Sequence, residues 1–315
     1  MTDAGTAVTV VVPTHRRPEG LARALTALAD QVDPDVPWDV LIVDNAPPTA
    51  HAVLDGVPLP VPARVVDEPR QGAAHARNCG MHEATGRWIA YLDDDVTPEP
   101  DWLRELVAPL LAGRADVTAG RVVLDQDAPR PPWWNRDWMD SYVAAYARGD
   151  DELELADDDF LLTANTCLDR DLLTRAGGFD PALGPRGGTQ LVNDDIQLFR
   201  RIRAAGGRVR YVPSAVTVHE LAANRTRRRW LARRLYLQGR SDWRLERGEP
   251  DATRGSVVRH ALALARADVR ALGPVWRWRR AYCYRATAVA LRAAGVLRES
   301  LTDRRGNDHI RNAGT

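Results

Sequence analysis

Short apolar segments alternate with segments of helical periodicity over the first 113 residues, and this alternation limits the fold more than any other feature. Residues 7–12, AVTVVV, form a continuous β-branched run, as expected of a strand that is buried on both faces. Further strands are predicted at 38–44, 63–68 and 87–92, and helices at 19–31, 72–85 and 100–113. The pattern predicts an α/β domain of the Rossmann-like type, with a mostly parallel sheet flanked by helices.

A different pattern begins at residue 124. Residues 124–159 are rich in Pro, Trp and acidic residues and are expected to form a long loop or lid. Strands are then predicted at 160–168 and 208–220, with a helix at 193–207 that begins with acidic residues and ends at a glycine pair. Residues 225–299 are predicted to be helical throughout.

These patterns divide the chain into two parts. We expect a domain over residues 1–222, with a first half at 1–123 and a second half at 124–222 that includes the Trp-rich lid. An Arg-rich helical extension at 223–315 would follow it.

Charge is distributed unevenly along the chain. Residues 201–315 contain 26 arginines and nine acidic residues, whereas residues 1–200 contain 17 arginines and 34 acidic residues. All 43 basic residues are arginines, so chemistry that depends on lysine is excluded. The asymmetry indicates an acidic site in the first part and a basic second part. The basic part would contact the acidic part, a second subunit of a homodimer or another anionic partner.

The cysteines and the apolar runs indicate the cellular compartment in which we expect the protein. Cys79, Cys167 and Cys283 are widely spaced and form no metal-binding pair, which fits a reducing compartment. No apolar run approaches the roughly 20 residues that a membrane span needs, and the first residues lack the pattern of a secretion signal. We therefore expect a cytoplasmic protein, with peripheral contact at the inner face of the membrane through the basic extension.

Three consecutive carboxylates, Asp93, Asp94 and Asp95, follow the strand predicted at 87–92. Like charges this close repel one another and resist burial unless a cation neutralises them. Mg²⁺ and Mn²⁺ prefer oxygen ligands and usually keep phosphate oxygens in their coordination shell. Because side chains i and i+2 of an extended segment point the same way, Asp93 and Asp95 are the predicted metal ligands.

Other polar residues follow the neighbouring strands. Pro13, Thr14 and Arg16 come after the first strand, where backbone amides and a guanidinium can meet a nucleotide. Asp44 ends the next strand and could accept a hydrogen bond from a base. Arg77 and Asn78 lie on the helix that follows Gly72, and they are the last two of these candidate binding residues.

The order of these segments resembles the family 2 glycosyltransferases of the GT-A fold. The resemblance covers roughly residues 7–220 and is carried by VVPTHRRPEGLARALTAL, LIVDN, GAAHARNCGMHEATGRWIAYLDDDVTPEPDWL and NDDIQLFRRIRAAGGRVRYVPSAVTVH. It implies an inverting transfer from a nucleotide-sugar donor, assisted by Mn²⁺ or Mg²⁺, with residues 1–123 binding the donor. It also implies that the strand-end residues named above contact the nucleotide, with Asp94 sharing the diphosphate and metal role of Asp93 and Asp95.

The same resemblance places the catalytic base in the acidic pair Asp194 and Asp195. Inversion at an anomeric carbon needs a carboxylate that takes the proton of the acceptor hydroxyl. Asp195 matches the base of the family, with Asp194 as the second candidate, and an acid complementing the helix dipole is the structural alternative. His219 follows the strand at 208–220 and stands where a histidine completes the metal shell in several GT-A enzymes.

The acceptor is less well defined by the sequence. Trp133, Trp134 and Trp138 lie in the lid, where aromatic rings either stack on a sugar or anchor the loop. TRRRW at 226–230 resembles the Q-x-x-R-W motif of processive synthases, but Thr226 replaces the Gln and no membrane helix is predicted, so we expect a single transfer. The acceptor classes are a small molecule, a glycan or a lipid-linked saccharide, and no nucleic-acid partner is expected.

Three alternative functions remain open at this point. DDDVT fits the D-x-D-x-T pattern of aspartate-nucleophile phosphatases, although those enzymes generally need a lysine. A sugar-1-phosphate nucleotidyltransferase would need a Gly-rich loop after the first strand, where this chain has PTHRRP. A non-enzymatic protein that binds a membrane surface through its arginines is the third alternative.

Overall fold

A computed structural model describes residues 6–157, 159–186, 189–190, 192–247 and 290–299 of the chain. The main sheet is built from β1 (Val8–Thr14), β2 (Trp38–Asp44), β3 (Ala63–Asp67), β4 (Trp88–Leu92), β5 (Val96–Pro98), β6 (Val117–Leu124), β7 (Leu153–Glu154), β8 (Asn165–Asp169) and β11 (Val209–His219). A separate hairpin consists of β9 (Pro185–Arg186) and β10 (Thr189–Gln190).

The strand order in the main sheet is β3-β2-β1-β4-β8-β6-β11-β5, with β7 paired to β11 beside this path. The four strands β3, β2, β1 and β4 are parallel, as are β6 and β11. Strand β8 lies antiparallel between β4 and β6, and β5 is antiparallel to β11. The α/β sheet expected from the sequence is confirmed, with these antiparallel strands as additions.

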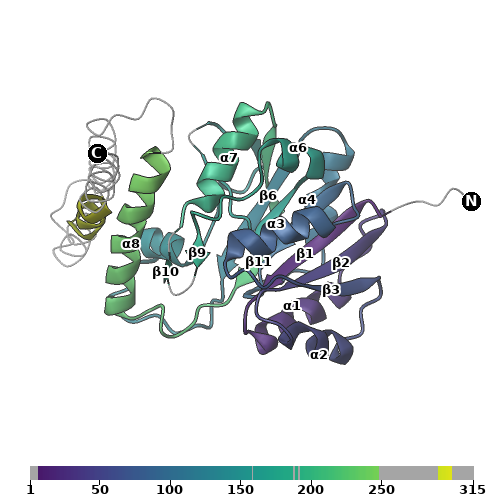
Figure 1. Cartoon of the computed structure of the whole chain (residues 1–315), viewed down its shortest axis with the longest axis horizontal. Helices are drawn as coiled ribbons and strands as arrows, with labels where there is room; N and C mark the ends of the chain where they lie inside the picture. Colours follow the sequence, from purple (N-terminus) through teal and green to yellow (C-terminus); the bar gives the residue numbers. More distant parts are fainter. Residues whose placement is uncertain (1–5, 158, 187–188, 191, 248–289, 300–315) are drawn as a thin grey trace, which may run out of the picture.

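Helices cover both faces of the sheet (Figure 1). They are α1 (Pro18–Ala29), α2 (Thr49–Gly56), α3 (Ala73–Glu83), α4 (Trp102–Leu111), α5 (Arg136–Met139), the 3-10 helix η1 (Asp140–Val143), α6 (Arg170–Arg175), α7 (Asp194–Ala204) and α8 (Arg228–Arg247). Residues 290–299 are also helical and lie beside α8 in Figure 1. Among the described residues, no helix combines the length and the apolar character that crossing a membrane requires.

The β-branched run of β1 forms a strand because both of its faces are buried. Val8, Val10 and Val12 pack in one core with α1 and α4, whereas Val11 packs in the other core with α3, α6 and α7. This two-residue period follows from the pleat of a strand. The polar residue that ends such a strand therefore emerges at the edge of the sheet.

The segment between β2 and β3 is rich in proline but contains α2, which is not among the helices predicted from the sequence. Asp44 explains the helix: its Oδ1 accepts a hydrogen bond from the Ala46 amide and its Oδ2 accepts one from the Ala50 amide. A carboxylate bonded to amides at a helix N-terminus stabilises that helix in spite of nearby prolines.

A third apolar core joins the lid segment to α8. It contains buried side chains from three regions, namely Leu124, Trp134, Met139, Val143, Leu221, Leu231 and Leu235. The segment 124–159 is therefore partly structured, with α5, η1 and β7, instead of being one long loop. Parts of the predicted helical extension, at 248–289 and 300–315, lie outside the described residues, as does Cys283.

Candidate active site

The candidate site lies where strands β1, β4 and β11 end together. In the register of the sheet Thr14 pairs with Asp44, and His219 pairs with Val96, which directly follows the acidic triplet. The Glu220 amide donates to the Asp95 carbonyl at 2.9 Å. Residues that are far apart in sequence thus meet at one edge of the sheet, as predicted.

Asp94 is the buried member of the triplet and is tied to the end of β1. Thr14 Oγ1 donates to Asp94 Oδ2 at 2.8 Å, and Arg17 Nε lies 3.5 Å from Asp94 Oδ1. Burial raises the pKa of Asp94 to about 7, and the neighbouring carboxylates add to this effect, while Arg17 and Thr14 oppose it. Asp94 therefore links the triplet to the first strand.

Asp95 carries three cationic or ionisable neighbours. Arg17 Nη1 donates to Asp95 Oδ2 at 2.9 Å, Arg225 Nη2 lies 3.4 Å from the same oxygen and His219 Nε2 lies 3.5 Å from it. Burial alone would raise the pKa of Asp95, but His219 and the two arginines outweigh it and hold the pKa below its usual range. Asp95 is therefore a charged carboxylate beside an imidazole.

Asp93 is connected to the acidic pair on α7 by a single arginine. Arg77 Nη2 donates to Asp93 Oδ1 at 3.0 Å, and Arg77 Nη1 donates to Asp194 Oδ2 at 2.9 Å. Arg77 is only 7% exposed; its burial acts to lower its pKa, but Asp93 and Asp194 outweigh that and raise it. One guanidinium from α3 thus joins the end of β4 to the start of α7.

Asp195 has a different environment from Asp194. Asp195 is a partly exposed residue and accepts a hydrogen bond from Thr163 Oγ1, whereas Asp194 is buried against Arg77. Burial and the adjacent Asp194 raise the pKa of Asp195 to about 7, against the effects of Arg77 and Thr163. Burial also raises the pKa of Asp194. The accessible carboxyl of the pair is therefore one that can exchange a proton near neutral pH.

Several predicted donor-binding residues have partners within the protein. Asp44 is fully buried and bonded to α2, as described above. Asn78 uses its whole amide on the backbone of Phe179, because Nδ2 donates to the carbonyl and Oδ1 accepts from the amide. Arg16 is exposed with a left-handed φ of 54°, and Pro13 is half-buried at the end of β1.

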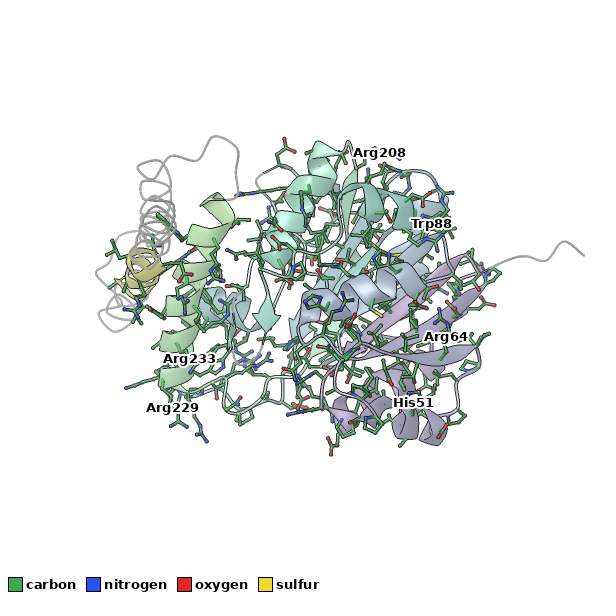
Figure 2. The ribbon with its side chains drawn as sticks, in the orientation of Figure 1. His51, Arg64, Trp88, Arg208, Arg229 and Arg233 are labelled. Atoms are coloured by element: carbon green, nitrogen blue, oxygen red, sulfur yellow. The ribbon has the colours of Figure 1, made fainter. Side chains whose placement is uncertain are left out.

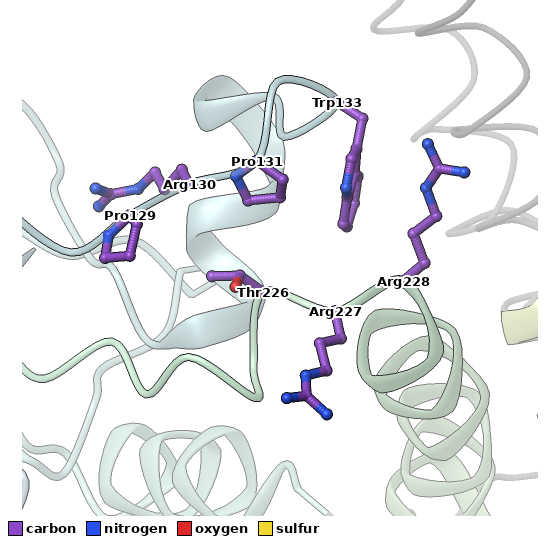
Figure 3. Close-up of a pocket in the computed structure, with 7 residues that line it drawn as sticks. All are labelled: Pro129, Arg130, Pro131, Trp133, Thr226, Arg227 and Arg228. Atoms are coloured by element: carbon purple, nitrogen blue, oxygen red, sulfur yellow. The ribbon is translucent and has the colours of Figure 1, made fainter.

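The three predicted acceptor-binding tryptophans differ in position. Trp133 lines a shallow depression of about 520 Å³ together with Thr226 and Arg228, whose guanidinium carbon lies 5.4 Å from the ring centroid (Figure 3). Trp134 is buried in the third core and donates from Nε1 to Asp140 at 2.6 Å. Trp138 packs edge to face on Tyr142. Only Trp133 among them faces this depression.

Sequence reasoning missed three residues that contact the carboxylates of the site: Arg17 and Arg225 contact Asp95, and Thr163 contacts Asp195. Arg17, Arg225 and Thr163 lie in the loop after β1, the loop after β11 and the turn before β8. The arginines belong to runs that contain several candidates, and no local spacing separates them. Within the described residues, no three His, Cys, Asp or Glu side chains are grouped so as to hold a metal ion.

Comparison with known proteins decides the family. The model of glycosyl transferase family 2 matches residues 9–166, and that of glycosyl transferase family group 2 matches residues 88–294. The chain belongs to glycosyl transferase family 2. Membership of family 2 makes the protein a glycosyltransferase, which sets aside the phosphatase, nucleotidyltransferase and non-enzymatic alternatives.

Two curated proteins are similar to most of this chain. The succinoglycan biosynthesis protein ExoM of Rhizobium meliloti is 31% identical over 243 residues, which are 76% of this chain and 74% of ExoM. The pre-mycofactocin glycosyltransferase of Mycobacterium tuberculosis H37Rv is 28% identical over 263 residues, which are 80% of this chain but only half of that enzyme.

A solved structure agrees with the family 2 fold. GalNAc-T7 in complex with UDP, GalNAc and Mn²⁺ superposes with a TM-score of 0.55 over 91% of this chain and 55% of that chain. At 15% sequence identity this likeness shows the shared GT-A fold alone.

Proposed function

We propose that this family 2 enzyme transfers one sugar from a nucleotide-sugar donor to an acceptor hydroxyl, with inversion at the anomeric carbon. The observation that carries the proposal is the position of Asp195, which is partly exposed beside Asp194 while Arg77 connects Asp194 to Asp93. This arrangement puts a carboxyl with a pKa of about 7 next to the strand end that is expected to bind the donor diphosphate.

Asp195 is assigned as the general base. In an inverting transfer a carboxylate removes the proton of the acceptor hydroxyl as its oxygen attacks the anomeric carbon, and the bond to the diphosphate breaks on the other side. Asp194 is unsuited to this role because its carboxylate is buried against Arg77. Thr163 orients Asp195 by donating to one of its oxygens and leaves the other for the acceptor.

The donor is assigned to the ends of β1 and β4. Thr14, Arg16, Arg77 and Asp94 are the assigned nucleotide-sugar contacts, and Pro13 shapes the loop after β1. Asp44 and Asn78 would act through the backbone segments that they hold, since their polar atoms are bonded to amides and carbonyls. A UDP-sugar is the favoured donor, and the screen below compares it with GDP- and dTDP-sugars.

The residues at the strand end fit a divalent cation that also binds the donor. Asp95 offers a carboxylate, and His219 adjoins it with a buried Nδ1 that has no hydrogen-bond partner among the described residues. One or two protein ligands are sufficient for Mg²⁺ or Mn²⁺ when phosphate oxygens supply others. Asp95 and His219 would hold the ion, with Asp93 as the further predicted ligand. When bound, it would neutralise charge on the diphosphate.

The depression beside Trp133 is the proposed acceptor site. Thr226 lines this depression and directly follows Arg225, which contacts Asp95 and His219. An indole ring at the edge of such a depression suits the apolar face of a sugar. One relative is named for succinoglycan biosynthesis and the other for pre-mycofactocin, so a glycan, a small molecule and a lipid-linked saccharide all stay as proposed acceptor classes.

Further partners are proposed from the arginines at the start of α8. Arg227, Arg229 and Arg233 are exposed, and Figure 2 shows Arg229 and Arg233 extending away from the body of the protein. Such a basic surface suits an anionic membrane or the acidic part of a second subunit. Membrane contact and a homodimer accordingly remain predictions.

A thermal-shift screen tests the donor and the metal together. UDP-, GDP- and dTDP-sugars are added to the protein with Mn²⁺, with Mg²⁺ or with EDTA. We expect one nucleotide to raise the melting temperature, and the increase to vanish with EDTA, because binding to the folded state alone stabilises it. An equal increase with EDTA would contradict the metal assignment. The absence of stabilisation by every sugar nucleotide would contradict the donor assignment.

A further inference from the structure

Helix α8 reaches the site through one residue, Asn193. Asn193 is the N-cap of α7 and directly precedes Asp194 and Asp195, with a left-handed φ of 77°. Its side chain is buried and bonded at both ends to α8. Nδ2 donates to Asp242 Oδ1 at 2.9 Å, and Oδ1 accepts from Gln238 Nε2 at 2.8 Å.

The residue type at this position serves two purposes. Asparagine is one of the few non-glycine residues that adopt the left-handed conformation readily, so the backbone alone would equally accept glycine. A glycine could not make the two side-chain hydrogen bonds to α8. The turn itself does not require these hydrogen bonds. The asparagine therefore adds a connection between α7 and α8.

The α8 side of this connection is itself held in place. Asp242 Oδ2 accepts from Arg292 Nε at 2.6 Å, and Gln238 Nε2 also donates to Asp242 Oδ1 at 2.9 Å. Gly239 permits the close approach of the helix at 290–299, since a Cβ there would lie 1.9 Å from the Arg292 carbonyl oxygen. A buried carboxylate with several donors is fixed in position, and losing one partner is costly.

A second bond connects the same two segments. Ser241 Oγ accepts a hydrogen bond from the Val192 amide at 2.9 Å, and Ser241 is fully buried. Two consecutive residues before the acidic pair, Val192 and Asn193, are thus bonded to one turn of α8. No hydrogen bond described for α8 reaches Asp195 itself, so any effect on the base must pass through this backbone.

We propose that Asp242 and Gln238 are positioning residues, which orient the catalytic base Asp195 by holding Asn193 and the first turn of α7. The inference rests on the proposed role of Asp195. Hydrogen-bonded side chains that fix a reacting group matter because displacement by about 1 Å can cost up to a hundredfold in rate. The helical extension is thereby assigned a part in the chemistry.

The test compares Asn193→Gly with Asp242→Ala and with the double variant. Turnover is measured as nucleoside diphosphate released from the donor that the screen identifies, with a donor titration for each variant. We expect kcat to fall about tenfold in each single variant while the donor KM changes less than about twofold, because orientation is lost and donor contacts are kept. The double variant should be no slower than the slower single variant, since each single variant already removes the hydrogen bond between Asn193 and Asp242.

Arg244→Ala is the matched control, because it removes a contact between α8 and the helix at 290–299, with Glu299, and leaves the hydrogen bonds of Asn193 in place. It should keep the wild-type kcat. An equal loss of kcat in Arg244→Ala would show a general effect of α8 packing and would overturn the inference. Wild-type kcat in Asn193→Gly would overturn it as well, provided that Asp195→Asn is inactive in the same assay. Full activity of Asp195→Asn would instead overturn the base assignment, and the inference with it.

Discussion

Asp194 and Asp195 are neighbours in the chain but have different partners. Arg77 pairs with Asp194, whereas Asp195 is partly exposed and bonded to Thr163. The Asp194 carboxylate is buried and bonded to Arg77, so an acceptor hydroxyl has poor access to it, whereas Asp195 is partly exposed. At the scale of residues, the environments of the two side chains support the proposal that Asp195 is the base and Asp194 is not.

The pH dependence of transfer follows from the pKa of Asp195. Burial and Asp194 raise this pKa to about 7, and the base acts in its deprotonated form. Turnover at saturating donor should therefore fall as the pH drops below about 7, approaching tenfold per pH unit. Steady-state kcat measured across the range between about pH 5 and 9 checks this. A flat profile below about 7 would contradict the assignment.

The carboxylates of the site and three of their partners, Thr14, Arg77 and His219, were predictable from the sequence, and other partners were not. Asp93 and Asp95 follow from a strand end that the local pattern defines well, and Asp195 follows from the resemblance to family 2. Arg17 and Arg225 are chosen from runs of arginines by the packing of distant loops, which no local pattern encodes.

At the scale of elements, α1 lies directly against the end of β4. A Cβ built on Gly20 would lie 2.4 Å from the carbonyl oxygen of Asp94, which is backbone and cannot move aside easily. The glycine lets the first turn of α1 approach the acidic triplet, where Arg17 pairs with Asp94 and Asp95. This contact couples the position of a helix to the geometry of the site.

Gly20→Ala should lower the melting temperature and weaken donor binding, because α1 must shift away from Asp94. The direction is opposite to helix propensity, by which alanine in a helix is favoured over glycine by about 1 kcal/mol. Gly56→Ala in α2 is the control, since a Cβ there meets nothing within 4 Å. Thermal denaturation with and without donor measures both effects. Equal stability of the two variants would show that α1 tolerates the side chain.

The elements that the sequence did not predict are those that depend on distant partners. Strand β5 has three residues and exists by pairing with β11, and β8 starts at Asn165 instead of residue 160. Helix α2 was hidden by prolines and depends on the buried Asp44. The long strands and the amphipathic helices were predictable, because each carries its own hydrophobic period.

At the scale of the whole molecule, the site lies between the two-sided α/β core and the third core. The strand ends form the proposed donor side, and the segment 124–159 with α8 forms the side that carries Trp133. Arg225 and Thr226 connect these two sides over one peptide bond. Donor and acceptor functions should therefore be separable by mutation.

Trp133→Ala should raise the KM for the acceptor about two- to tenfold and leave donor binding unchanged, because an aromatic contact contributes about 0.5–1.5 kcal/mol. The control is Trp88→Ala, which also removes an indole ring. Trp88 is the first residue of β4 and lies at the end of that strand away from the site. Initial rates over an acceptor titration give the result. A raised donor KM with an unchanged acceptor KM would place the depression on the donor side.

The most direct test of the central claim is the pair of measurements on Asp195→Asn, which keeps the shape of the side chain and removes its ability to accept a proton. We expect sugar transfer to fall by about 10²–10⁴-fold, as is typical for loss of a general base. Calorimetric binding of the nucleotide-sugar with Mn²⁺ should stay close to that of the unchanged protein. Transfer at the normal rate, with donor binding intact, would contradict the assignment of this acidic site as the centre of glycosyl transfer.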